Sequence, residues 1–246
     1  MKKLLALVVV LCTVAGANAQ IVRSTTFQKQ KSATTWYVGV GLSMNNFTGP
    51  AMSDFKKDVK HLSDAYNVGF GTNVGFDIQG GFMKNFGKLP LWWGMQLGFG
   101  TRGAKYHEKY TYMSEWDSYS SEDKTSYNFY TFKYTPFQIG YMFNCFDKFS
   151  VNPHLGIFLS VDMAGNCKWK EYYDGDLDEE DSYGYGDSDF DACRFDAGLQ
   201  LGLGLWYDHV GLDFTWQRGF VNIFDDFYNN KGIQSSNAIL SIVYKF

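Results

Sequence analysis

Long segments in which every second residue is apolar constrain the fold of this chain more than any other feature. The clearest covers 194–207, where Leu199 and Leu201 alternate with Gly198 and Gln200. Successive side chains of a β-strand point to opposite faces, so the pattern predicts a strand with one apolar face and one small or polar face. Similar alternation recurs at 35–45, 67–85, 91–106, 129–143, 151–164, 194–207, 210–219 and 237–246.

The length and composition of these segments predict strands that cross a membrane. A tilted transmembrane strand needs about 10 residues, and the second face here interleaves polar residues with Gly, which suits a narrow lumen. The chain has 19% aromatic residues, 26 Gly and 4 Pro. Its mean hydropathy of −0.26 fits a barrel in which only alternate residues face lipid. We predict an all-β, eight-stranded antiparallel transmembrane β-barrel; the alternative is a soluble β-sandwich.

The predicted connections alternate in length, as they do in outer-membrane barrels. Short connections lie at 85–90, 144–148 and 207–209, whereas the long, polar ones cover 46–66, 107–127, 165–193 and 220–236. We therefore expect short periplasmic turns and long extracellular loops. An even number of strands places both termini in the periplasm.

The first residues have the features of a secretory signal. Lys2 and Lys3 precede an apolar run over 4–14, and small residues end at Ala19, before Gln20. The apolar run is shorter than a membrane anchor requires. We predict a signal peptide over 1–19, cleaved between Ala19 and Gln20, a short periplasmic tail over 20–34, and a barrel over 35–246.

The C-terminus predicts recognition by the barrel assembly machinery. Tyr244 and Phe246 lie two residues apart, on the apolar face of the last strand. We therefore expect an integral protein of the bacterial outer membrane, surrounded by outer-membrane lipid and lipopolysaccharide, with envelope proteins as further possible partners. The net charge of −4 argues against nucleic acid as a partner.

Several motifs along the chain point to one family. They are Leu91-Trp92-Trp93-Gly94-Met95-Gln96-Leu97, Tyr134-Thr135-Pro136-Phe137-Gln138-Ile139-Gly140-Tyr141, Arg194-Phe195-Asp196-Ala197-Gly198, Arg218-Gly219-Phe220-Val221-Asn222-Ile223 and Tyr244-Lys245-Phe246. In order and spacing, over about 35–246, the chain resembles the PorT-like outer-membrane β-barrel family of the Bacteroidetes. Most members have no assigned activity. Gln96 stands where members often have Glu, so the resemblance implies no role for a carboxylate there.

We expect a non-enzymatic barrel that is structural or presents an extracellular binding surface. The first alternative is an accessory component of a secretion or surface-assembly system, similar to type IX secretion. The second is an outer-membrane enzyme or a small pore. No cofactor is predicted, because the four His residues show no metal-ligand spacing and no Ser/His/Asp set gathers at one strand end.

The long connection over 171–191 is rich in Asp and Glu. Asp174, Asp176 and Asp178 alternate with other residues, and several carboxylates can ligate Ca²⁺. We favour a solvated, mobile loop kept extended by its like charges over a calcium site. A short helix over 54–62 is similarly less favoured than an irregular loop.

The inward faces of the strands predict a polar network that fills the lumen. Arg102 should meet Asp162 or Asp196, whereas Asp77 and Asp213 have no evident cation nearby. Buried charges need partners, so we expect a plugged lumen rather than a diffusion channel. The predicted network consists of Asp77, Gln96, Arg102, Asp162, Asp196 and Asp213.

Three cysteines follow the signal peptide. Cys167 and Cys193 follow one predicted strand and precede the next, at the same end of the barrel, and an oxidising compartment permits a disulfide. We predict a Cys167–Cys193 bond. Cys145 lies in a turn at the opposite end, too far away to compete.

Overall fold

The computed structural model describes residues 34–59, 66–86, 89–113, 118–187 and 190–246. The predicted signal peptide, its cleavage site at Ala19 and Gln20, and nearly all of the predicted tail lie outside the described residues. No helix in the described part of the chain is long and apolar enough to span a membrane.

Antiparallel β-strands make up nearly all of the described chain. The strands are β1 (Thr34–Thr48), β2 (Tyr66–Gly71), β3 (Asn73–Asn85), β4 (Leu91–Met113), β5 (Ser118–Tyr141), β6 (Phe143–Asn144), β7 (Phe149–Tyr173), β8 (Asp176–Gly184), β9 (Phe195–Tyr207), β10 (Val210–Gly219), β11 (Phe224–Tyr228) and β12 (Lys231–Lys245). Pairing runs in the order β1-β3-β4-β5-β7-β9-β10-β12, and β12 also pairs with β1.

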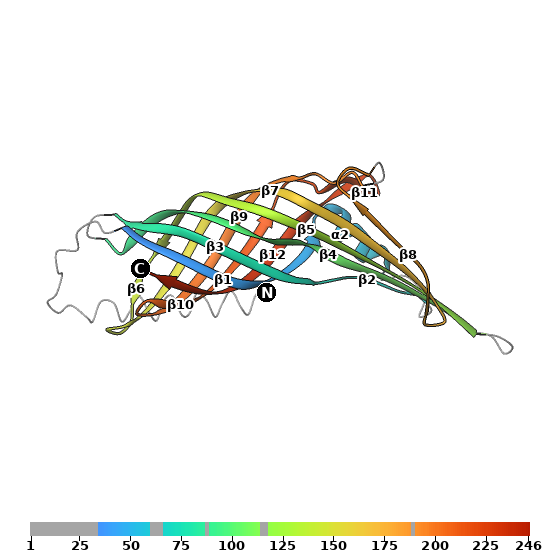
Figure 1. Ribbon diagram of the computed structural model, residues 1–246, viewed down its shortest axis with the longest axis horizontal. Helices are drawn as coiled ribbons and strands as arrows, with labels where there is room; N and C mark the ends of the chain where they lie inside the picture. Colours follow the sequence, from blue (N-terminus) through green and yellow to red (C-terminus); the bar gives the residue numbers. More distant parts are fainter. Residues whose placement is uncertain (1–33, 60–65, 87–88, 114–117, 188–189) are drawn as a thin grey trace.

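The two ends of the molecule differ in the way the strands are connected (Figure 1). At the end we call the short-turn end, few residues separate β3 from β4, β5 from β7 and β9 from β10, and the C-terminus lies there. The opposite end, which we call the long-loop end, holds α2 (Pro50–Val59), β2, β8 and β11. This is the predicted alternation of short and long connections.

Residue alternation sets the two faces of the wall. In β9, Leu199 and Leu201 are exposed on the outside, while Gly198 and Gln200 are buried on the inside. The pattern repeats in β10 and β12. Exposed Leu, Ile, Phe and Val side chains therefore cover the outer surface, as lipid contact requires.

A β-bulge in β5 changes one predicted face. Tyr134 and Phe137 of β5 pair with Leu159 and Ile157 of β7, so β5 has an extra residue there. Pro136 lies in this bulge, a position that suits a residue with no N–H to donate. Alternation over the predicted strand 129–143 puts Thr135 and Phe137 on the same, outward face, but Thr135 is buried at 2% exposure. The prediction was wrong because strict alternation does not continue through a bulge.

Two connections predicted as loops are largely strands. β4 and β5 pair without interruption from Arg102–Phe129 to Met113–Ser118, and β7 continues to Tyr173 before it returns as β8. Asp174 and Gly175 form the turn with φ of 48° and 93°, the left-handed conformations of a two-residue hairpin. We call the part of β2, β4, β5, β7 and β8 beyond the barrel the projecting sheet; it extends to the right in Figure 1.

A helix occupies the first long connection. α2 begins at Pro50, directly after Gly49 with φ of 116°, and buries Ala51, Met52 and Phe55. Proline is favoured in the first turn because its fixed φ suits a helix and its missing N–H would be unpaired there. The favoured expectation of an irregular loop was therefore wrong. Leu62, at the predicted helix end, lies outside the described residues.

Candidate functional site

The centre of the lumen network is Arg102 of β4. Its Nη2 lies 2.5 Å from Oδ2 of Asp162 on β7, and its Nη1 lies 3.2 Å from Oδ2 of Asp196 on β9. Arg102 is 1% exposed. The sequence predicted one of these partners, and the structure supplies both, because β7 and β9 are neighbours and Arg102 of β4 reaches both across a narrow lumen. Tyr185 also donates to Asp162, at 2.9 Å.

Asp77 of β3 has a cation partner that the sequence analysis missed. Nζ of Lys133 on β5 donates to Oδ2 of Asp77, and Lys133 is 6% exposed. Strict alternation through β5 placed Lys133 on the lipid face. The bulge at Pro136 turns Lys133 inward, so a proline within a predicted strand was the signal that could have found it.

Asp213 of β10 also has a partner, contrary to expectation. Nε2 of His154 lies 3.0 Å from Oδ1 of Asp213, and the hydroxyl of Thr215 donates to Oδ2 at 2.7 Å. His154, one of the four His residues without metal-ligand spacing, forms this hydrogen bond in the lumen. The two side chains lie on strands that are not neighbours in sequence, which is why the pairing was not evident.

Amide side chains form a further hydrogen-bonded group in the lumen. Gln96 donates to Oε1 of Gln79 at 2.5 Å and accepts from the hydroxyl of Tyr37 at 3.2 Å. Gln138 in turn donates to the Tyr37 hydroxyl at 2.8 Å. The predicted residue Gln96 therefore belongs to a connected network that crosses the lumen.

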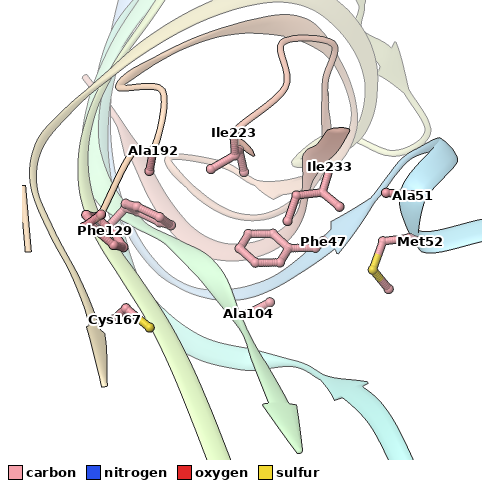
Figure 2. Close-up of a cluster of buried hydrophobic side chains, with 10 residues drawn as sticks. Phe47, Ala51, Met52, Ala104, Phe129, Cys167, Ala192, Ile223 and Ile233 are labelled. Atoms are coloured by element: carbon pink, nitrogen blue, oxygen red, sulfur yellow. The ribbon is translucent and has the colours of Figure 1, made fainter. Parts of the chain in front are cut away.

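Apolar side chains close the lumen on both sides of this network. At the long-loop end, Phe47, Phe129, Ile223 and Ile233 point into the ring of strands in Figure 2. At the short-turn end, Trp92 and further apolar residues form a second cluster, made of Tyr37, Met83, Trp92, Trp206 and Val243. A cavity beside the second cluster has a volume of about 20 Å³, close to that of one water molecule.

A wider hollow lies beyond the second cluster, at the short-turn end. Its volume is about 350 Å³, and Trp92, Met142, His209, Lys245 and Phe246 are among the residues that line it. Trp92 lines both this hollow and the small cavity, so the aromatic cluster separates the two.

Tyrosines cover one face of the projecting sheet. The ring centroids of Tyr66 and Tyr110 are 4.7 Å apart, and those of Tyr112 and Tyr119 are 5.2 Å apart. Tyr119 also stacks on Tyr173 at 6.0 Å. We call these five residues the tyrosine row. It continues the lumen-facing side of β4, β5 and β7 beyond the barrel.

The candidate calcium ligands do not converge on one point. Asp174 is in the turn between β7 and β8 and accepts a hydrogen bond from the Ser120 amide at 2.7 Å. Asp176 and Asp178 follow along the extended strand β8. Within the described ranges, no group of three or more His, Cys, Asp or Glu residues could hold a metal ion. The segment 176–184, expected as part of a solvated, mobile loop, is a strand that pairs with β7.

The predicted Cys167–Cys193 disulfide is not formed, since both thiols are free. β7 does not end near residue 164 as expected, and Cys167 therefore pairs with Tyr127 on β5 and Tyr183 on β8. It is buried in the apolar cluster of Figure 2. Cys193 is exposed and precedes β9. Burial raises the pKa of the Cys167 thiol to about 11.

The C-terminal aromatics lie on the outer face, as their alternation predicted. Tyr244 and Phe246 are 50% and 65% exposed, and their ring centroids are 6.5 Å apart. The Phe246 amide donates to the Trp36 carbonyl at 2.9 Å, which joins the last strand to the first. Recognition by the assembly machinery stays a prediction.

The solved structures to which the chain is similar include several outer-membrane barrels. Neisserial surface protein A is 14% identical, with 87% of this chain and 99% of that chain covered and a TM-score of 0.38. The attachment invasion locus protein Ail of Yersinia pestis is 12% identical, with coverage of 87% and 99% and a TM-score of 0.34. The protease OmpT of Escherichia coli is 10% identical, with coverage of 91% and 99% and a TM-score of 0.33. Comparison with curated proteins gives no match.

A family model provides the assignment. The model described as the outer membrane protein beta-barrel domain matches residues 4–246, nearly the whole chain. The antiparallel wall, its apolar outer surface and its polar lumen agree with this match. The protein therefore belongs to the outer membrane protein beta-barrel domain family and is an integral protein of the outer membrane.

Proposed function

We propose that this protein is a non-enzymatic outer-membrane barrel that presents an extracellular binding surface. Eight strands form its closed wall: β1, β3, β4, β5, β7, β9, β10 and β12. The short turns face the periplasm and the projecting sheet faces the exterior. Within the outer membrane protein beta-barrel domain family, the motifs quoted above favour the PorT-like group of the Bacteroidetes.

The tyrosine row carries this proposal. Tyrosine supplies a large, rigid contact area with a polar hydroxyl, and it is enriched at protein–protein interfaces. In the row, Tyr66, Tyr112 and Tyr173 are exposed. A sheet whose strands continue in register beyond the membrane holds these rings at fixed spacing.

A photo-crosslinking amino acid at Tyr119, incorporated in living cells, tests the binding surface. We expect a discrete adduct with an extracellular or envelope partner. The same amino acid at Tyr207, exposed beside a short turn, is the matched control and should not give that adduct. Identical patterns from both positions would contradict the proposal. An adduct with a component of a secretion system would favour the alternative role in surface assembly.

Both apolar clusters argue against a diffusion pore. The lumen between them is filled by Arg102, Lys133, Gln96 and their partners, and the wider hollow ends at Trp92. We expect purified protein in planar bilayers to show no stable conductance at the level of general porins. Stable single-molecule openings of that size would make transport the leading function. As a comparison, a variant without the α2 residues Ala51 and Met52 should also show no conductance. Phe129 and Ile223 of the same cluster remain and should keep the lumen closed.

The non-enzymatic role is supported by the position of the His154–Asp213 pair. Both residues are buried in the lumen, between the two apolar clusters. Thr215 donates to Asp213 and not to His154, so the three residues do not form the relay that activates a nucleophile. A substrate would have to displace an apolar cluster to reach them.

A further inference from the structure

The two faces of the projecting sheet carry opposite charge. Cross-strand register on the lumen side brings four carboxylates into one row, Glu108, Asp123, Glu171 and Glu179. The outer side carries cations on the same three long strands. We call this outer side the basic face, and it comprises Lys105, His107, Lys109, Lys124, Lys168 and Lys170.

Strand pairing brings the basic residues close together. His107 of β4 pairs with Lys124 of β5, which pairs with Lys170 of β7. One row nearer the barrel, Lys105 and Lys168 lie on either side of Ser126. Neighbouring strands are about 4.8 Å apart, so these two lysines are separated by roughly 10 Å.

The acidic residues on this face do not neutralise its charge. Glu122 pairs with Lys124 at 3.1 Å, and Glu180 pairs with Lys170 at 3.0 Å. Lys105, Lys109 and Lys168 are exposed and form no ion pair within the described residues. Lys124 and Lys170 face each other across strands, and each of them is offset by its own carboxylate. The face therefore has a net positive charge in a chain whose net charge is −4.

The basic face lies directly above the lipid-facing surface. Phe99, Tyr130 and Met163 are large side chains exposed on the outside of the barrel, on β4, β5 and β7. Lys105, Lys124 and Lys168 lie five or six residues further toward the long-loop end on the same strands. With a rise of about 3.3 Å per residue and a tilt of about 40°, the lysines are roughly 13–15 Å above those side chains. Lysine stems are flexible and can reach back toward the headgroups.

We propose that the basic face binds phosphate groups on the headgroup of the glycolipid in the outer leaflet, that is, lipopolysaccharide. A cluster of lysines beside a membrane attracts anionic headgroups. Because this face points away from the lumen, its ligand would lie outside the barrel. The inference rests on the orientation given under Proposed function. It adds a lipid ligand on the face opposite to the tyrosine row.

Titration of the full-length detergent-purified protein with bisphosphorylated lipopolysaccharide tests this proposal. We expect the triple variant K105A/K124A/K168A to bind about 100-fold more weakly, on the order of fivefold for each lysine lost beside an anionic surface. The triple variant K105R/K124R/K168R keeps the charge and should bind like the natural chain. The matched control K56A/K84A/K148A removes three exposed lysines elsewhere and should also retain binding.

Other ligands and added salt show whether the binding measured in the titration depends on the phosphate groups of the lipid. Dephosphorylated lipopolysaccharide should bind as weakly as the alanine variant, and millimolar inorganic phosphate should not displace the lipid. Binding should weaken as salt is raised, because exposed charges are screened. Equal affinity for both forms of lipopolysaccharide, equal loss in the control variant, or equally tight binding of dextran sulfate would overturn the proposal. Since the titration uses detergent, these outcomes do not depend on the orientation of the protein in cells.

Discussion

Arg102 places one positive charge between the carboxylates of Asp162 and Asp196, in a part of the lumen closed by apolar side chains on both sides. Thr131 adds a hydrogen bond to Asp162 at 2.7 Å, and Ser235 adds one to Asp196 at 2.5 Å. Removal of a buried ion is costly because desolvated partners are left unpaired. Arg102 therefore stabilises the barrel mainly by satisfying two acids that have no access to water.

Replacement of Arg102 tests this role. We expect R102M to lose roughly 3–5 kcal/mol of unfolding free energy, the usual cost of removing one member of a buried ion pair. Urea unfolding in lipid vesicles measures it. The variant R102M/D162N/D196N neutralises the whole group and should recover much of that loss. If R102M were as stable as the natural chain, the acids would already be neutral or hydrated, and the argument would be wrong.

Among the elements, β5 shows how one residue sets the faces of a whole strand. The bulge at Thr135 and Pro136 shifts the alternation by one residue. Odd-numbered residues face the lumen before the bulge, whereas even-numbered residues such as Gln138 face it after the bulge. Lys133 and Thr131 enter the lumen for this reason. The Asp77–Lys133 pair therefore depends on the bulge as much as on its own two side chains.

Deletion of Pro136 should be far more harmful than its replacement. Without the extra residue, Lys133 would face lipid, and a lysine near the bilayer midplane costs roughly 2–4 kcal/mol. The acid Asp77 would also lose its partner. We expect the deletion variant to fail to migrate as a folded barrel in unheated gel samples. P136A keeps the residue count and should fold normally; a folded deletion variant would show that the register can slip without cost.

For the whole molecule, the orientation in the membrane can be tested with its own cysteines. Cys193 is exposed near the long-loop end, Cys145 is exposed near the short turns, and Cys167 is buried with a raised thiol pKa of about 11. A membrane-impermeant maleimide on intact cells should therefore label Cys193 only. Because the thiolate is the reactive form, Cys167 should stay unlabelled at neutral pH.

Permeabilised cells provide the control for this experiment. After the outer membrane is opened, Cys145 should become labelled as well, and C193S should remove the signal from intact cells. Labelling of Cys145 but not Cys193 on intact cells would reverse the orientation. It would place the projecting sheet in the periplasm, and both the extracellular binding surface and the contact with the outer leaflet would then be excluded.

The sequence by itself determined the all-β class, the approximate position of the strands and the polar nature of the lumen. Each of these follows from period-2 alternation, which is a local property that one strand carries without its neighbours. The outward Leu residues of β9 and the inward position of Arg102 could be predicted for this reason. The contact of Arg102 with Asp162 or Asp196 also followed, because all three lie toward the same end of the barrel.

Only the tertiary structure decided which residues meet across the lumen and where strands replace loops. His154 meets Asp213, and Lys133 meets Asp77, because closure of the wall and a single bulge set their heights and faces. The expected Cys167–Cys193 disulfide is absent because β7 pairs with β5 and β8 far beyond its predicted end. The charge separation of the projecting sheet likewise arises from register between strands. Pairing across long sequence distances supplies this information, and alternation within one strand does not contain it.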